Sequence, residues 1–223
     1  MSIEHPLLRA RGVRHGFGTR GDAPPDGLLR PCQVHGARVA RAQECADGVE
    51  ADAVVATAAA SHPVGVVTAD CVPVLAASAD GLAVAAIHAG WRGLAAGVIG
   101  AGIDALRREA RGVELCAVVG PHIGACCYEI DAPVLDALRH FAGDLDAATT
   151  AGRPQHHWLD LGALARAALV RAGVSATEIG ATPRTCTSCD ARRFHSYRRD
   201  GPRAGRLVHW IAVRILDSAR GDA

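Results

Sequence analysis

Three apolar stretches rich in valine and isoleucine constrain the fold of this 223-residue chain more than any other feature. The first combines VGVV with VPVL, and the other two read LAVAAI and ELCAVVG. Turn residues bound each stretch, and short apolar runs of this composition are typical of buried strands. The later segment GRLVHWIAVRIL predicts a closing strand.

Apolar residues at helical spacing predict three helices. The first begins near Leu94 and ends near Arg108, the second covers APVLDALRHFAG, and the third covers LDLGALARAALVRAG and ends at Gly173. Strands and helices therefore mix without strict alternation. This pattern favours an α/β fold of the α+β type, a mixed β-sheet sandwich flanked by helices, over a doubly wound nucleotide-binding fold.

We expect residues 1–223 to form a single domain. Residues 1–31 are expected to be irregular, and the stretch from Gly18 to Pro31 is rich in Gly, Pro and Asp, as loops are. Within the same chain, Pro73 interrupts an apolar run, which predicts a bend or an edge position for that strand.

The charge balance points to a small substrate. Lys plus Arg number 24 and Asp plus Glu number 23, so no overall field attracts nucleic acid or an anionic membrane. Basic residues do cluster in ARRFHSYRRDGPRAGR, which fits either an anion pocket or a solvated face. We find no signal-peptide core and no apolar segment long enough to cross a bilayer, so a cytoplasmic location is expected. In that compartment the eight cysteines indicate metal ligation, thiol chemistry or burial.

Two residues flank the predicted strand pair. His88 closes LAVAAI and precedes AGWRG, so its ring is expected at the end of a strand beside a helix N-terminus, where clefts form. Cys71 lies in TADCVPVL next to Asp70. Taken singly, each fits a structural role at least as well, either a histidine bonded to a loop carbonyl or an inert buried thiol.

His35, in CQVHGARV, supplies a third candidate ligand. Two histidines and one cysteine with an open position make a catalytic zinc arrangement. The three residues lie too far apart in the sequence to form a local metal-binding signature, so spacing alone does not assemble them.

Four further cysteines allow a second metal or redox site. Cys186 and Cys189 in CTSCD have the gap of a zinc half-site or a redox pair, and Cys126 and Cys127 in ACCYE could supply the other half. Adjacent cysteines are poor partners for one tetrahedral ion, and a zinc ribbon has two pairs with that gap, so the sequence favours no four-cysteine site. The nucleobase-deaminase signature is absent, because Thr185 precedes Cys186 and no His-x-Glu occurs.

Taken together and in order, QVHG, TADCVPVL, IHAGWRG with GPHIGACCYEI, and CTSCDARRFHSYRRDG closely resemble the bacterial YfiH-type family. Its members are known as laccase-domain or polyphenol-oxidase-like proteins and were later assigned as purine nucleoside phosphorylases. The resemblance runs from about Gly16 onward. It implies a mixed α/β sandwich and one metal, zinc or sometimes copper, bound by the residues that stand here as His35, Cys71 and His88.

The resemblance also implies activity. The family is credited with phosphorolysis of adenosine, inosine and 5'-methylthioadenosine, which gives free base and the sugar 1-phosphate, and with hydrolytic deamination of adenosine. Multicopper oxidation is not expected, because a multicopper oxidase needs many more histidines arranged in paired motifs than this chain offers. Its single Met is residue 1, so a blue-copper axial thioether is missing as well. Relative to the family, FGTRGDAPPDGLLRPCQVHG is abbreviated, which affects Arg20 and the pocket wall.

For deamination, Asp70 is the nearest candidate to carry the proton. For phosphorolysis, Arg92 at the helix after HAGWRG, with Arg20, is expected to bind phosphate. SYRRDG, with Arg198 and Arg199, is a second candidate, although this segment fits a structural ion-pair cluster with Asp200 equally well.

Two other interpretations remain open at this point. One is a metal-free cysteine hydrolase with Cys71 as nucleophile and His88 as base. The other is a cell-wall quality-control protein with weak catalysis, a role to which the family has also been linked. In every case we expect a monomer or homodimer that takes small molecules.

Overall fold

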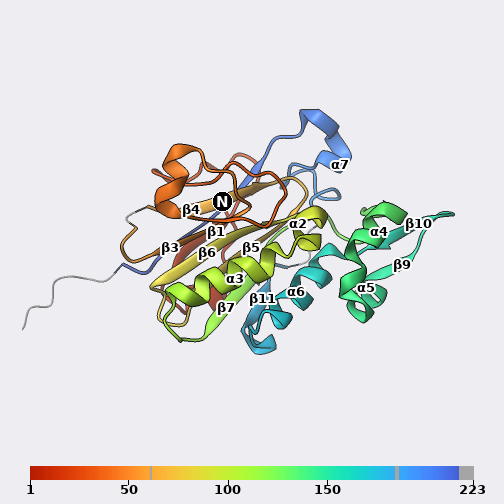
Figure 1. The fold of residues 1–223 in the computed structure, drawn as a ribbon. Coiled ribbons are helices and arrows are strands. Elements are labelled where there is room, and N and C mark those ends of the chain that lie inside the picture. Colours follow the sequence, from red (N-terminus) through yellow and green to blue (C-terminus); the bar gives the residue numbers. More distant parts are fainter. Residues whose placement is uncertain (61, 184–185, 216–223) are drawn as a thin grey trace, which may run out of the picture.

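The computed structural model describes residues 1–60, 62–183 and 186–215, and its centre is a six-stranded mixed sheet (Figure 1). Strand β5 lies in the middle and pairs antiparallel with both neighbours, while parallel pairs close the two edges. The spatial order is β11 (Ile179–Ala181), β7 (Leu115–Val119), β5 (Val72–Ser78), β6 (Ala83–Ala89), β3 (Ala53–Thr57) and β2 (Val39–Arg41).

Layers cover both faces of this sheet. One face packs against α3 (Val98–Glu109) and α6 (Leu161–Arg171), which lie in front of the strands in Figure 1. The other packs against an antiparallel sheet of β1 (Arg14–Phe17), β12 (Leu207–Ala212) and β4 (Val64–Thr68). Side chains alternate along each strand, so Val74 faces the helices and Leu75 faces the small sheet. The predicted mixed α/β sandwich is confirmed.

A third, smaller unit projects at the right of Figure 1. It contains a sheet in the order β8 (Glu129–Asp131), β10 (His156–Leu159) and β9 (Thr149–Ala151), with α4 (Ala132–Leu138) and α5 (Gly143–Ala148). The remaining elements are short: α1 (Pro6–Arg9), α2 (Trp91–Ala95), α7 (Tyr197–Asp200), and the 3-10 turns η1 (Ala42–Asp47), η2 (Arg139–Phe141), η3 (Ala176–Glu178) and η4 (Gly201–Arg203). Within the described residues, no helix is long and apolar enough to cross a membrane.

The structure corrects three predictions. The helix expected from Leu94 to Arg108 is two helices, α2 and α3, because Gly97 between them has a φ of +83° that breaks the helix. The strand with Pro73 is central rather than at an edge, and the predicted bend falls just before it, at residues 69–71. Residues 1–31 are not wholly irregular, since they include α1 and β1, whereas residues 18–31 contain no helix or strand.

His209 on β12 is fully buried between the two sheets. Its Nε2 lies 2.8 Å from Thr68 Oγ1, and its Nδ1 has no hydrogen-bond partner in the described part of the chain. Burial, with a smaller contribution from the charge of His88, lowers the pKa of His209 to about 3. The ring is therefore neutral in the folded protein at neutral pH.

This pKa shift makes folding stability depend on pH. Above pH 6.5 both states leave His209 neutral, and below it only the unfolded chain takes up the proton, until the pH reaches about 3. We expect this histidine to lower the free energy of unfolding by about 2 kcal/mol between neutral pH and pH 5. Urea unfolding of wild type and His209→Gln at pH 7.5 and 5 measures this, and equal pH dependence in the two proteins would contradict the prediction.

Candidate functional site

The predicted ligands meet where β5 begins and β6 ends. Antiparallel pairing sets Pro73 opposite His88, so Cys71, two residues before Pro73 and on the same face, lies diagonally next to His88. His35 reaches the same point from the loop before β2, and its ring contacts the His88 ring edge to face at 4.9 Å. One ligand atom from each of the three lies within 4.8 Å of the others. The fold therefore assembles the set that sequence spacing alone could not.

Asp52, just before β3, fixes the positions of His35 and His88 through hydrogen bonds. Its carboxylate is fully buried, and Oδ1 lies 2.8 Å from His88 Nδ1. The same carboxylate accepts hydrogen bonds from the backbone N–H groups of His35 at 2.9 Å and Gly36 at 2.7 Å. Burial acts to raise the pKa of Asp52, but these hydrogen bonds outweigh it and the pKa is lowered. The ionised carboxylate accepts a hydrogen bond from Nδ1–H of His88, so Nε2 is the ring nitrogen that can bind a metal.

The loop that carries His35 is fixed on two sides. His35 itself has a φ of +62°, a conformation uncommon outside glycine. Gln33 pairs with Val67 on β4 as a strand residue would, donating from Nε2 to the carbonyl at 2.8 Å and accepting from the amide at 2.7 Å. Together with Asp52, these bonds hold the exposed His35 ring over Cys71.

Mutual hydrogen bonding shifts the pKa values of the site. Burial raises the pKa of the Cys71 thiol, but hydrogen bonds from His35 and His88 have the larger combined effect and lower the pKa to about 7. Burial lowers the pKa of His88, whereas Asp52 and Cys71 raise it, to about 9. A large fraction of Cys71 is therefore thiolate at neutral pH, and the thiolate is the form that binds metals and attacks electrophiles.

The donor set fits a metal ion. Two imidazoles and one thiolate suit zinc or copper, and three protein ligands leave a coordination position open for water or substrate. Gly90 is part of this fit, because a Cβ there would lie 2.8 Å from Cys71 Sγ. A larger residue at position 90 would push the Cys71 sulfur away from the two histidine rings.

A cavity of about 890 Å³ opens directly onto the three ligands. Its walls include the aromatic rings of Trp91, Tyr128 and Tyr197. Its volume lies in the range of about 300–1,000 Å³ typical of small-molecule sites. A second cavity, of about 510 Å³, lies beside α3 and α6 and contains none of the predicted site residues.

Four arginines line the larger cavity, and none of them forms an ion pair with a carboxylate among the described residues. They are Arg30, Arg92, Arg198 and Arg206. The Arg92 guanidinium stacks over Trp91 at 4.3 Å. These four cationic groups outnumber the one carboxylate in the described lining of the cavity, that of Asp70, so the cavity is suited to an anionic ligand.

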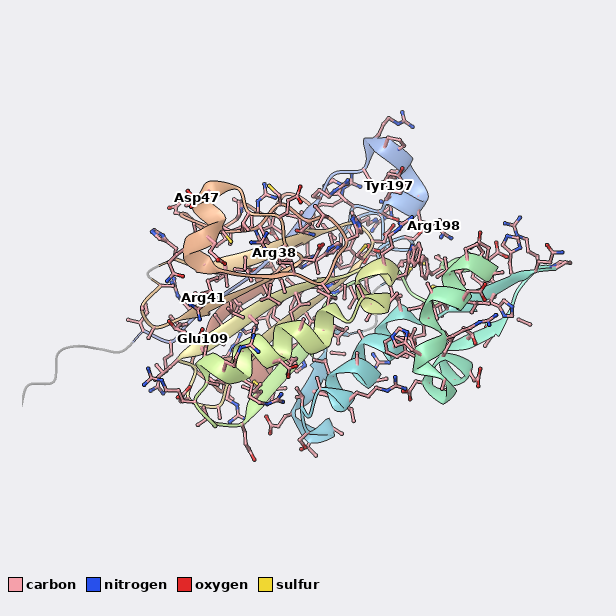
Figure 2. All side chains as sticks on the ribbon, viewed as in Figure 1. Arg38, Arg41, Asp47, Glu109, Tyr197 and Arg198 are labelled. Carbon is pink, nitrogen blue, oxygen red and sulfur yellow. The ribbon has the colours of Figure 1, made fainter. Side chains whose placement is uncertain are left out.

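Arg198 and Asp70 build one wall of the cavity. Arg198, labelled on α7 in Figure 2, donates from its guanidinium to the carbonyls of Cys127 at 3.0 Å and Glu129 at 3.1 Å. Its backbone N–H donates to Asp70 at 2.8 Å, and Thr187 Oγ1 donates to the other oxygen of that carboxylate at 2.5 Å. Both residues therefore anchor the segment that follows residue 186 against the site.

Two other arginines from the sequence prediction lie elsewhere. Arg20 does not line the cavity, and its guanidinium donates to the carbonyl of Ala191 at 2.7 Å. Arg199 pairs with Asp200 at 2.7 Å, so the ion-pair interpretation holds for Arg199. The sequence interpretation did not name Asp52, Arg30 or Arg206 as site residues. Asp52 had a signal, an acid directly before an apolar run, and Arg206 ends the basic stretch ARRFHSYRRDGPRAGR, which fitted an anion pocket.

A family model described as multi-copper polyphenol oxidoreductase laccase matches residues 14–214. The chain belongs to this family. The resemblance to YfiH-type proteins is thereby confirmed.

Within this laccase-like family, the chain is similar to proteins named for purine nucleoside chemistry. A purine nucleoside phosphorylase of Xylella fastidiosa is 41% identical over 187 residues, which cover 80% of this chain and 70% of that protein. An adenosine deaminase RL5 from an unknown prokaryotic organism is 36% identical over 202 residues, covering 83% and 75%. The crystal structure of YlmD from Geobacillus stearothermophilus superposes with a TM-score of 0.82 at 26% identity, covering 95% and 94%. The names of these relatives support a purine nucleoside enzyme.

Proposed function

We propose that this protein is a metal-dependent purine nucleoside phosphorylase that cleaves adenosine, inosine and 5'-methylthioadenosine and also deaminates adenosine. One observation carries the proposal. A single cavity joins the His35, Cys71 and His88 ligand set to aromatic walls and to arginines that form no ion pair among the described residues. A nucleoside and a phosphate need this combination of surfaces.

Phosphorolysis forms a bond between a phosphate oxygen and the anomeric carbon of the sugar, while the bond from that carbon to the purine nitrogen breaks. The bonding electrons leave with the purine, which then takes up a proton. We assign the phosphate to Arg92 and Arg30, because both are exposed and both line the cavity. Trp91 and Tyr128 offer ring faces for the purine.

His35, Cys71 and His88 would hold the metal, zinc or copper, with Asp52 orienting His88. When bound, such an ion supplies Lewis acidity, which activates water for deamination at neutral pH. Asp70 faces the cavity and is our candidate for moving the proton to the departing amine. The hydrogen bonds that Asp70 accepts from Thr187 and Arg198 hold its carboxylate in place for that role.

Product analysis tests the proposal. Each of the three nucleosides is incubated with the zinc-loaded protein, with and without phosphate, and the products are separated by chromatography. We expect free base and sugar 1-phosphate only with phosphate, and inosine from adenosine in either case. Zinc-loaded protein that releases neither free base nor inosine would refute the proposed function.

The geometry also favours a second candidate, a metal-free cysteine hydrolase. Asp52, His88 and Cys71 lie in series, with the pKa of the thiol lowered to about 7, as in enzymes with a cysteine nucleophile and a histidine base. Metal analysis distinguishes the two candidates. Stoichiometric zinc that protects Cys71 from alkylation supports the metal enzyme, whereas metal-free active protein that Cys71 alkylation inactivates supports the hydrolase.

Replacing Arg92 with glutamine tests the phosphate site. Because a hydrogen bond to a charged group contributes about 1.5–3 kcal/mol, we expect KM for phosphate to rise about tenfold or more in Arg92→Gln. Phosphate-independent deamination should change little. Steady-state kinetics with varied phosphate measures both, and Arg108→Gln, an exposed arginine on α3 outside the cavity, is the matched control. An unchanged KM for phosphate would remove Arg92 from the site.

A further inference from the structure

A second cluster of thiols lies outside the nucleoside site. Cys126 and Cys127 come from the turn before β8, and Cys186 and Cys189 come from a turn more than fifty residues later. We call these four residues the cysteine clasp. All four sulfur atoms lie within 4.8 Å of one another. The sequence argued against this arrangement because two of the cysteines are adjacent, so their convergence is a correction.

The turn explains how adjacent cysteines converge. The amide of Cys127 donates to the carbonyl of Gly124 at 3.0 Å, which closes a tight turn around the pair. The sulfur of Cys189 then lies 3.6 Å from that of Cys126 and 3.3 Å from that of Cys127. Both members of the adjacent pair therefore point at the same third sulfur.

These separations suit a tetrahedral metal. With zinc–sulfur bonds of about 2.3 Å, neighbouring sulfurs of a four-cysteine site lie about 3.8 Å apart. The sulfur of Cys189 already lies 3.6 Å from that of Cys126 and 3.3 Å from that of Cys127, close to this spacing, and all separations in the clasp are within 4.8 Å. Four cysteines with no other ligand type form a closed, structural zinc site rather than a catalytic one.

The surroundings of the sulfurs support a metal site. The backbone N–H of Gly124 donates to Cys186 Sγ at 3.2 Å, the kind of outer contact that stabilises a ligating thiolate. A Cβ on Gly124 would lie 3.3 Å from both Cys126 Sγ and Cys186 Cβ, so a side chain there would crowd the cluster. A parallel bridge between His122 and Cys186 already aligns the two turns.

We propose that the cysteine clasp binds one structural zinc ion that ties the turn before β8 to the segment leading into α7. That segment carries Arg198, whose guanidinium bonds to the carbonyl of Cys127 within the clasp. The segment also carries Thr187, which bonds to Asp70. The ion fixes the cavity wall through these bonds. This effect on catalysis rests on the proposed function, whereas metal binding by the clasp does not.

Metal counting tests the clasp. Protein purified under reducing conditions with zinc and then dialysed is expected to retain two zinc ions per chain. Cys189→Ser and, as a second variant, Cys126→Ser should each retain only the zinc ion of the nucleoside site. Cys71→Ser should retain only the zinc ion of the clasp. Cys45→Ala is the matched control, because Cys45 belongs to neither thiol cluster, and it should retain two. Cobalt substitution gives an independent readout, since thiolate-to-cobalt absorption should fall strongly in the clasp variants and only slightly in Cys71→Ser.

The outcomes separate this proposal from the proposed function. Two zinc ions in a protein without phosphorolysis would support the clasp and refute the function, and one zinc ion with phosphorolysis would do the reverse. Clasp thiols of the wild type that react with an alkylating agent at the same rate with and without zinc would overturn the proposal. A disulfide between Cys127 and Cys189 that forms in preference to zinc binding would overturn it too.

Discussion

Cys71→Ser is expected to lose the metal ion of the nucleoside site and nearly all phosphorolysis. Cys71 is the only thiolate among the three ligands, and its sulfur also meets both histidine rings. Because loss of a residue that merely supports a ligand typically costs 10–100-fold in affinity or activity, loss of the ligand itself should cost more than about 100-fold in kcat/KM. Metal content and single-turnover cleavage of inosine with phosphate measure the effect.

Cys32→Ser is the control for Cys71→Ser. Cys32 is an exposed cysteine that lines the same cavity but belongs to neither ligand set. It should keep the metal and the activity. Cleavage at the wild-type rate by a metal-free Cys71→Ser protein would show that the reaction does not depend on this centre.

Asp52→Asn is expected to have the second-largest effect. The amide would present N–H groups to a site that now receives donors from His88 and from the backbone of His35 and Gly36. We expect metal affinity to fall about 10–100-fold, because the carboxylate orients His88. The free energy of unfolding should fall by about 2 kcal/mol, because buried donors lose their acceptor. Competition with a zinc chelator and urea unfolding measure the two effects.

The matched control is Asp47→Asn. Asp47 is an exposed acid on η1, labelled in Figure 2, with no hydrogen bond to the site among the described residues. It should change neither quantity. If Asp52→Asn binds zinc as tightly as the wild type, Asp52 supports only the loop that carries His35 and does not strengthen metal binding by His88.

The sequence predicts the buried strands well, because their apolar runs depend on local composition. It does not predict that β5 is central, because a proline usually indicates an edge strand or a bend. In the structure the carbonyl of Pro73 still accepts a hydrogen bond from the N–H of Gly120, just beyond the end of β7. The helix break at Gly97 was also missed, because glycine is tolerated within helical patterns and only the tertiary fold sets its φ.

For the site, His35, Cys71 and His88 are each ambiguous in sequence and become a set only through family resemblance or through the fold. Asp52 was missed because a buried acid before a strand has no characteristic spacing to the histidine that it orients. The cysteine clasp was judged unfavourable because spacing rules describe common ribbons, whereas a tight turn at Gly124 brings adjacent thiols to one point. Arg30 reaches the cavity by loop geometry that no local pattern encodes, whereas Arg206 ends a basic stretch that the sequence could not distinguish from a solvated face.

The two halves of the nucleoside site differ in how much of the chain must fold to make them. Cys71 and His88 meet through a β-hairpin of neighbouring strands, a short closure that costs little chain entropy. Asp70 instead accepts hydrogen bonds from Thr187 and Arg198, which are 117 and 128 residues away in the sequence. Such distant contacts form only after the intervening chain has found its topology. The pairing of Cys71 with His88 thus requires only a local hairpin, whereas the wall that Asp70 helps to form requires that distant parts of the chain have folded together.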